Sequence, residues 1–595
     1  MLFGFYRTFL MFFRLPSYLG TKRRFAGLAF ASVVVLFPLV CTPSAAIADD
    51  TGPSSLQPAA FNYTGTYSLR ETDPNLTGKG VAIAAVCRSL TYLDGQPQND
   101  YRLNTEHKCF LDSNVSFVDG LSLKPGISEH STAIGGILVG HDLNASHPQV
   151  GTFQYEGAVP EAQLDVYEFW RFLVNYVFGP KELKADILTM SVGTAFEDWW
   201  TRGIERMVQS NGLIVLAGVG NGGDVFDPIL YPAAGSNVIG VGVIDSVTGS
   251  DPSKGLSDFS LPHAEHSSAG PTSDGRCKPD IVAPGNCLVP DANSTSRYDV
   301  TGDWSSFATP VVAGTVGLLV QKAKSEPDLN LAVSSEAGNC VMKAILMNSA
   351  TKLPYWHKGS SDKADDHRVS LDYVQGAGML NAQGAYEQLI AGRGQTGDVQ
   401  QIGWDNNVIE ESENARNVYR IEIPEAKDRI ITATLVWNMH YEDEYPFKAL
   451  TQADNDLRLE LWAVEADDTN EGYLIDYSDS ISDNVEHIYC PADPNYSNYE
   501  IVVTFSAVSD SNDTDAKERY GLAWNTNDAD KTESIYWYDL NGDGKVDSLD
   551  FAVLLKNLNQ PAESDTGYLL GDINMDEVID IKDVVILMGH MTPKT

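Results

Sequence analysis

The chain has few basic residues for its size. It contains 41 lysines and arginines against 81 aspartates and glutamates, which gives a formal net charge of −40 at pH 7. An acidic surface repels nucleic acid and anionic membranes, so we expect neither as a partner. The surplus of carboxylates favours calcium binding and keeps an extracellular protein in solution.

Long apolar runs are also scarce, and the one that stands out lies near the N-terminus. Lys22, Arg23 and Arg24 precede the apolar segment 25–40, and small residues follow it up to Ala48. This order predicts a signal peptide over residues 1–48, cut after Ala48. A membrane anchor is the alternative, but the apolar core is shorter than the ~20 residues that a spanning helix needs. We therefore expect a secreted, extracellular protein with no membrane segment.

Cysteine is rare as well. There are seven, and cleavage after Ala48 removes Cys41. The even number that remains, in an oxidising compartment, predicts disulfides. Cys277 and Cys287 bracket a short loop and are the first candidate pair. Cys87 with Cys109 is the next, and other pairings stay open.

The texture of the sequence divides the 595 residues into domains. Residues 49–395 alternate strand-like and helix-like segments, which is typical of an α/β domain with a mostly parallel sheet flanked by helices. Residues 400–527 contain short β-forming runs between acidic turns and predict an all-β sandwich. The segments 455–457 and 520–524 resemble those of a known jelly-roll domain, which implies a jelly-roll-like sandwich. Residues 535–595 form a small helical module at the C-terminus.

Three distant segments carry side chains suited to acyl transfer. Ser306 precedes a long apolar helical run, and a helix N-terminus favours the negative charge that develops on a substrate oxygen. His130 begins a small apolar stretch and is a candidate general base. Asn221 ends a strand in a glycine-rich turn, where its amide can donate to an oxyanion. Taken singly, these residues are more often a helix cap, a structural histidine and a turn residue.

In their residues and in their order along the chain, the segments resemble the subtilisin-like serine protease (subtilase) family. Further matches are Gly157–Ala162, Asp186–Gly193, Tyr231–Ala233 and Ser268–Gly285, so the resemblance spans roughly residues 75–395. It implies that Ser306 is the nucleophile, that His130 takes and returns its proton, and that Asn221 forms the oxyanion hole with the Ser306 amide. It also implies that the main chain of Ser191, Val192 and Gly193 binds an extended peptide substrate.

The sequence departs from the family pattern at the third catalytic group. Cys87 follows the strand 80–86 at the position where the family has aspartate. A thiol cannot stabilise imidazolium as a carboxylate does, and losing that charge costs about 10⁴ in turnover in a serine protease. Three explanations remain open: Asp94 or Asp100 replaces the missing group, the enzyme works slowly as a Ser–His dyad, or the domain only binds peptides. Trp304, Ser305 and Ser131 depart from the pattern as well.

The C-terminal module contains a repeated acidic loop. Oxygen-bearing side chains recur at the spacing of an EF-hand calcium loop, and an apolar helical run follows each copy. Two such loops, each ending in aspartate, resemble a type I dockerin, which implies bound Ca²⁺ and a possible cohesin domain as partner. Glu577 stands where a loop has its turn glycine. The expected metal positions are Asp539, Asn541, Asp543, Lys545, Asp547 and Asp550, then Asp572, Asn574, Asp576, Val578, Asp580 and Asp583.

The sequence thus predicts a secreted serine-type endopeptidase that forms an acyl-enzyme at Ser306. The alternative is a catalytically inactive subtilase-fold protein that binds peptides and docks to cohesins through its C-terminal module.

Overall fold

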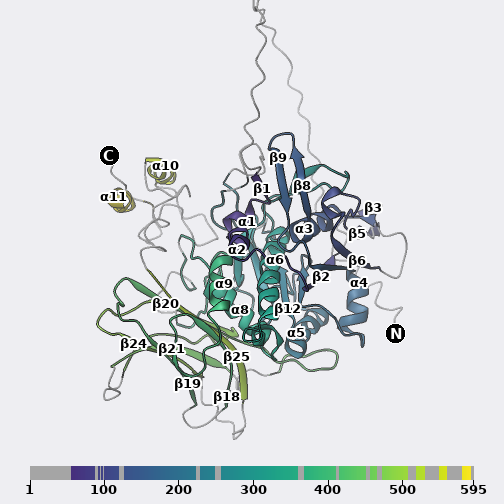
Figure 1. The fold of residues 1–595 in the computed structure, drawn as a ribbon. Coiled ribbons are helices and arrows are strands. Elements are labelled where there is room, and N and C mark those ends of the chain that lie inside the picture. Colours follow the sequence, from purple (N-terminus) through teal and green to yellow (C-terminus); the bar gives the residue numbers. More distant parts are fainter. Residues whose placement is uncertain are drawn as a thin grey trace, which may run out of the picture. The chain divides into compact units, whose positions relative to one another are not determined.

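A computed structural model describes most of the chain after the predicted signal peptide (Figure 1). The described residues are 55–87, 92–93, 96–97, 100–119, 126–222, 228–247, 256, 258–354, 356–359, 367–410, 415–450, 456–465, 472–506, 517–528, 548–558, 579 and 581–590. Among these residues no helix combines the length and apolarity needed to cross a membrane.

A seven-stranded parallel sheet organises the first domain. Its strand order is β14-β13-β12-β11-β2-β10-β6, and every neighbouring pair is parallel. Helices cover both faces, which explains why the central strands read as nearly continuous apolar runs. The strands are β2 (Ala82–Cys87), β6 (Asn114–Val118), β10 (Gln163–Glu168), β11 (Ile187–Met190), β12 (Ile214–Gly218), β13 (Ile239–Ile244) and β14 (Ile281–Pro284).

The two faces of the sheet build separate apolar cores. Alternate residues of β2 point to opposite sides: Ile83 packs with α3 (Glu129–Val139) and α6 (Ser305–Ser325), whereas Ala84 packs with α5 (Trp199–Asn211). Helices α3 and α6 contact each other, and α6 also contacts β11 to β14. This packing fixes the N-terminus of α6 against the sheet.

Smaller elements surround this framework. A three-stranded sheet has the order β1-β9-β8, and three further pairs are β3 with β4, β5 with β7, and β15 with β16. Their bounds are β1 (Ser55–Gln57), β3 (Tyr92–Leu93), β4 (Gln96–Pro97), β5 (Asp100–Arg102), β7 (Gly126–Ile127), β8 (His141–His147), β9 (Gly151–Glu156), β15 (Leu288–Pro290) and β16 (Tyr298–Val300). The remaining helices of this domain are α1 (Ala60–Tyr63), α2 (Thr66–Thr72), α4 (Phe169–Phe172), α7 (Leu331–Ser334), α8 (Gly338–Asn348) and α9 (Ala382–Ile390).

Two sheets follow in sequence and enclose their own core, which confirms the predicted β-sandwich. One sheet has the order β17-β19-β24-β21-β22 and the other β18-β25-β20-β23. The residues between them include the large buried side chains Trp437, Tyr499 and Trp524. The strands are β17 (Gly397–Val399), β18 (Gly403–Glu410), β19 (Arg416–Glu422), β20 (Arg429–Trp437), β21 (Leu457–Val464), β22 (Tyr473–Ser478), β23 (Val485–Pro491), β24 (Asn498–Phe505) and β25 (Lys517–Asp528).

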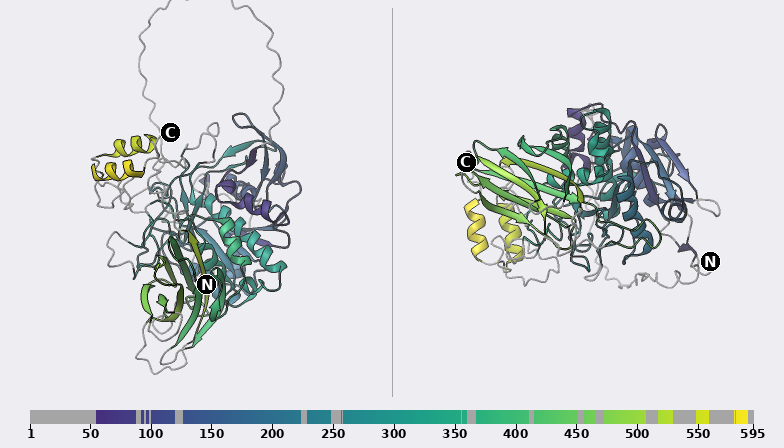
Figure 2. Two further views of the ribbon diagram at one scale, coloured as in Figure 1. Left: turned by 60° about the vertical axis from the view of Figure 1, so that its left-hand side comes forward. Right: turned by 90° about the horizontal axis from the view of Figure 1, so that it is seen from below.

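The four-stranded sheet also packs on the first domain through α8 (Figure 2). The approach is close: a Cβ placed on Gly521 of β25 would lie 2.4 Å from the main-chain nitrogen of Val341 in α8. Buried hydrogen bonds cross the same interface, including Thr434 Oγ1 to Asn348 Oδ1 at 3.0 Å. The sandwich and the α/β domain therefore share a tightly packed boundary.

Two helices are described in the C-terminal module, α10 (Ser548–Asn557) and α11 (Ile581–His590). They contact each other, and Leu554 and Leu587 are fully buried. Both lie where the sequence predicts a helix after an acidic loop.

Candidate active site

Ser306 is the second residue of α6 and is half buried. Trp304 caps the helix without a side-chain hydrogen bond, so its indole does not occupy the free amides of the first turn. The Ser306 amide is one of these, and the helix dipole adds positive potential there. The nucleophile predicted from the sequence therefore lies beside a site that favours an anion.

Asn221, which follows β12, reaches the same helix end. Its Oδ1 accepts hydrogen bonds from the main-chain N–H of Ser305 at 3.0 Å and from the Ser305 hydroxyl at 2.9 Å. The Ser305 hydroxyl in turn accepts from the Gly220 N–H at 3.2 Å. Because its oxygen is held twice, the Asn221 amide presents its nitrogen as the free donor.

The segment Ser191–Gly193 lies next to the nucleophile on the other side. Pro310 has no N–H, so the Ser306 carbonyl lacks its usual donor four residues along the helix. The Ser191 hydroxyl donates to that carbonyl instead, at 2.7 Å. Gly193 packs closely on the main-chain oxygen of Tyr231, where a Cβ would come within 2.7 Å. The predicted substrate-binding segment is thus anchored at the nucleophile.

His130 is the second residue of α3, and its ring packs against Phe307, the residue after Ser306, with 5.5 Å between ring centroids. Both ring nitrogens are buried, and within the described part of the chain neither has a hydrogen-bond partner. Burial lowers the pKa of His130 to about 4. The imidazole is therefore neutral near pH 7 and close to the nucleophile, but no hydrogen bond joins it to Ser306.

Cys87 ends β2 with a buried thiol. Burial raises the pKa of this thiol to about 11, and the nearby Ser131 hydroxyl lowers it by a smaller amount. The Ser131 hydroxyl nevertheless makes no hydrogen bond to the Cys87 thiol, since Ser131 Oγ has no hydrogen-bond partner. Cys87 thus brings no negative charge to the histidine at neutral pH.

The two carboxylates considered from the sequence fall in different places. Asp94 lies outside the described residues. Asp100 lies in β5, and its carboxylate packs against Gly126 of β7, where a Cβ would come within 1.8 Å of Asp100 Oδ1. It makes no hydrogen bond to His130.

Two residues near the site were missed by sequence reasoning. Ser305 orients Asn221, and its place next to the nucleophile was the available signal. Glu168 pairs with Cys87 in the parallel register of β10 and β2, but its carboxylate accepts from the Arg171 N–H in α4. Aligning the ends of the two strands would have drawn attention to it.

The predicted disulfide between Cys277 and Cys287 is not present. Every cysteine in the described part is a free thiol: Cys87, Cys109, Cys277, Cys287, Cys340 and Cys490. Strand β14 lies between Cys277 and Cys287, and its four extended residues span about 13 Å. A disulfide needs Cα atoms within about 7 Å, and an extended strand between the two cysteines does not favour that approach.

Most of the predicted calcium positions lie outside the described residues. These are Asp539, Asn541, Asp543, Lys545, Asp547, Asp572, Asn574, Asp576, Val578 and Asp580. Asp550 falls within α10. Asp583 is fully buried in the first turn of α11, next to buried Val584.

Comparison with known proteins identifies the families that the sequence matches. The sequence profile of the subtilase family matches residues 71–385, and that of the dockerin type I domain matches residues 537–592. Subtilisin-like protease SBT6.1 of Arabidopsis thaliana is 29% identical over 271 residues, which cover 44% of this chain and 22% of that protein. Serine protease AprX of Bacillus subtilis (strain 168) is 28% identical over 291 residues, which cover 43% of this chain and 59% of that protein.

A solved structure, the self-cleaved protease domain of PatA, is 21% identical with a TM-score of 0.35 and covers 53% of this chain and 99% of its own. The matched residues span only part of the two relatives named above, about a fifth of the Arabidopsis protein and three fifths of the Bacillus protein. The profile match extends over more than half of the 595 residues. The chain belongs to the subtilase family and carries a type I dockerin domain at its C-terminal end.

Proposed function

We propose that this protein is a serine endopeptidase in which Ser306, His130 and Asn221 act on an extended peptide. The observation that carries the proposal is the meeting of three distant segments at the N-terminus of α6: Asn221 binds Ser305, Ser191 binds Ser306, and His130 packs on Phe307. Family membership supports the same reaction class.

In the proposed mechanism the Ser306 hydroxyl attacks the scissile carbonyl as its proton passes to the neutral His130. The developing oxyanion accepts hydrogen bonds from the Asn221 side-chain nitrogen and the Ser306 N–H. The intermediate then collapses, and His130 protonates the leaving amine. Water hydrolyses the acyl-enzyme by the same steps in reverse, with His130 again as base.

The base acts in this proposal without a carboxylate partner. His130 has no hydrogen-bonded acid in the described part of the chain, and the pKa of Cys87, about 11, keeps that thiol protonated. An unsupported imidazole can still accept the serine proton, but its imidazolium form lacks charge stabilisation. We therefore infer a Ser–His dyad that turns over slowly, on the scale of the ~10⁴ loss seen when a triad loses its carboxylate charge.

The second candidate is a peptide-binding protein without catalysis. Its support is the absence of a hydrogen bond from either His130 nitrogen, since activation of Ser306 requires one to form when substrate binds. In this alternative Ser191–Gly193 would still pair with an extended peptide.

We further propose that the protein is exported, that its C-terminal module binds Ca²⁺, and that it docks to a cohesin domain. The dockerin match and the predicted signal peptide over residues 1–48 support this. Asp583, the last predicted ligand of the second loop, is buried in the first turn of α11. Calcium would neutralise the two acidic loops so that α10 and α11 can hold their packing.

Covalent labelling separates the two candidates. The full-length protein is incubated with a fluorophosphonate at pH 7 in calcium, and the mass shift is located by peptide mapping. The enzyme should take up one label per chain at Ser306, whereas Ser306→Ala should take up none and His130→Ala should label far more slowly. A folded wild-type protein that never labels overturns the peptidase and leaves the peptide-binding alternative.

A further inference from the structure

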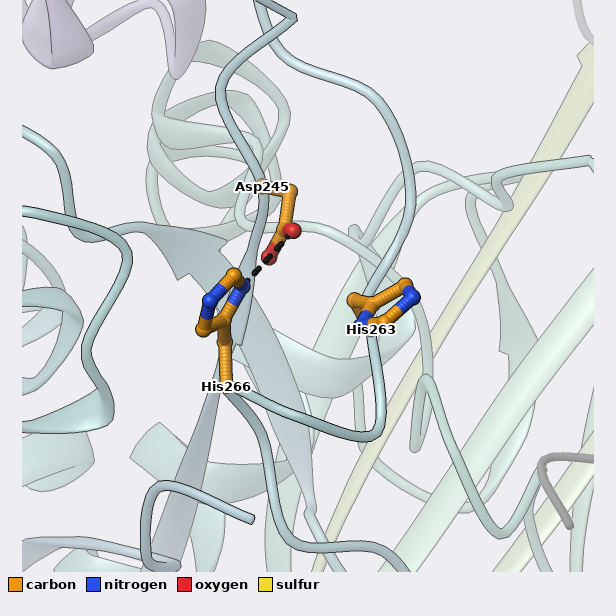
Figure 3. Close-up of side chains that lie close together, drawn as sticks. All are labelled: Asp245, His263 and His266. Atoms are coloured by element: carbon orange, nitrogen blue, oxygen red, sulfur yellow. Dashed lines mark hydrogen bonds and ion pairs between the residues drawn. The ribbon is translucent and has the colours of Figure 1, made fainter. Parts of the chain in front are cut away.

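A second cluster of reactive side chains lies beside the turn that carries Asn221, residues 219–222, which we call the oxyanion turn. Asp245 follows β13, and His263 and His266 lie three residues apart on one tight turn, closed by hydrogen bonds from the N–H groups of His266 and Ser267 to the His263 carbonyl at 2.9 Å. Figure 3 shows the Asp245 carboxylate and both imidazoles gathered together. One ligand atom from each of the three lies within 4.8 Å of the others.

We propose that Asp245, His263 and His266 form a binding site for one divalent transition-metal ion, with Zn²⁺ as the best fit. Two imidazoles and a carboxylate are a donor set typical of zinc, and three protein ligands leave a fourth tetrahedral position for water. Calcium and magnesium prefer oxygen donors, so this site differs in chemistry from the dockerin loops.

The first supporting observation is an unsatisfied oxygen. Asp245 Oδ2 lies 2.8 Å from His266 Nδ1, whereas Asp245 Oδ1 is buried and has no hydrogen-bond partner. A buried oxygen without a donor costs about 1–3 kcal/mol, and more when the group is charged. Asp303 adds negative potential next to Asp245, while its own oxygens accept from the N–H and hydroxyl of Ser246. A cation bound at this carboxylate would relieve both penalties.

The second supporting observation is that the site can close. Zinc ligands lie about 2.0–2.2 Å from the ion, so the three donor atoms must draw closer than their present limit of 4.8 Å. His263 is exposed, and among the described residues its ring accepts only the Glu265 N–H, at 3.2 Å. Its imidazole can therefore rotate toward Asp245 while β13 and the His266 side chain stay in place.

The location links the site to the catalytic machinery without placing an ion on it. The turn that carries both histidines packs on the oxyanion turn: Ser268 Oγ accepts from the Gly222 N–H at 3.3 Å, and a Cβ on Gly222 would lie 1.7 Å from the Ala264 carbonyl. The rings of His266 and Trp304, the N-cap residue of α6, also make a T-shaped contact with 5.6 Å between their centroids. A bound ion would stiffen the surroundings of Asn221.

Metal binding tests the proposal directly. The full-length protein, saturated with calcium to fill the dockerin, is dialysed against micromolar Zn²⁺ and its zinc content is measured. Co²⁺ substitution then reports the geometry through the visible absorption of a tetrahedral site. We expect one equivalent of zinc in the wild type and the loss of that equivalent in His263→Ala, His266→Gln and Asp245→Asn.

Glu265→Gln is the matched control, because Glu265 is an exposed acidic residue on the same turn but outside the cluster. It should keep the full equivalent of zinc. If His266→Gln fails to fold, His263→Ala carries the test, since this exposed ring contributes little packing. Equal zinc content in the wild type and His263→Ala overturns the proposal, as does loss of zinc in Glu265→Gln to the same extent as in His263→Ala.

Discussion

The Ser305 hydroxyl donates to Asn221 Oδ1 at 2.9 Å, and the Ser305 N–H donates to the same oxygen at 3.0 Å. These two bonds determine which end of the Asn221 amide faces the nucleophile. The residue before Ser306 therefore orients Asn221, the donor proposed for the oxyanion hole. Ser305 is one of the residues at which the sequence departs from the family pattern.

Removal of that hydroxyl should weaken catalysis selectively. We expect Ser305→Ala to lower kcat by about 10-fold, less than the 10²–10³ lost when an oxyanion donor itself is removed, because the main-chain bond remains. KM for a peptide should change little. Ser305→Thr keeps the hydroxyl and should retain activity in steady-state peptide assays. A Ser305→Ala enzyme with unchanged kcat would contradict this role.

A carboxylate placed at Cys87 should strengthen the base. In Cys87→Asp the new side chain could accept from the unpartnered Ser131 hydroxyl and stabilise the His130 imidazolium. We expect kcat/KM for a peptide to rise by a factor on the order of 10²–10⁴. Cys87→Asn has a similar shape without the charge and should show no such gain. A folded Cys87→Asp protein with no increase would contradict the dyad mechanism.

Carboxylate substitutions test whether the dyad is complete. Asp100 contacts Gly126 and not the histidine, so Asp100→Asn should leave turnover unchanged. Asp94→Asn should behave in the same way when peptide hydrolysis is measured. A loss of several orders of magnitude in Asp94→Asn alone would identify Asp94 as the missing third group and replace the dyad mechanism.

The pH dependence should reveal the unsupported imidazole. Burial lowers the pKa of His130 to about 4, so this base stays deprotonated from neutral pH down to about pH 5. We expect the rate of Ser306 labelling to be flat over that range and to fall as pH drops through about 4. In Cys87→Asp the fall should move up toward the ordinary histidine pKa of about 6.5, because a carboxylate favours the imidazolium. A wild-type midpoint between 6 and 7 would contradict the neutral, partnerless state.

Calcium binding should divide between the two C-terminal loops. Asp539→Ala and Asp572→Ala each remove the first predicted ligand of one loop, and each should bind one equivalent less than the wild type in calcium titrations. The second loop should be the weaker, because Glu577 replaces the turn glycine. Removal of calcium with a chelator should reduce helical circular dichroism. Unchanged stoichiometry in both variants would contradict two-loop binding.

The fold was largely predictable from the sequence, because the patterns that indicate its two main domains are periodic or local. Alternation of strand and helix patterns indicates a parallel sheet with helices on both faces, and short β-forming runs such as Arg429–Trp437 indicate a sandwich. The contact of Gly521 with α8 was not predictable, because a glycine in a strand does not reveal which distant backbone approaches it.

The sequence predicted the residues of the candidate site but not the hydrogen bonds around them. Local motifs predicted Ser306, His130 and Asn221 as site residues. The two hydrogen bonds from Ser305 to Asn221 depend on tertiary geometry. Cysteine pairing failed for a related reason. Closeness in sequence suggested Cys277 and Cys287, but both are free thiols in the structure and an extended strand lies between them. The cluster of Asp245, His263 and His266 likewise depends on two segments that only the fold brings together.

Strand β25 is the last described strand before the residues that match the dockerin type I domain. The strand ends at Asp528, shortly before the dockerin match begins at residue 537, and it is hydrogen-bonded along its length between β18 and β20. If a partner holds the dockerin domain, a force on the chain would enter the described fold at Asp528 and act on the hydrogen bonds that join β25 to β18 and β20. Gly521 of the same strand lies against Val341 of α8, so the α/β domain would share that force with the sandwich.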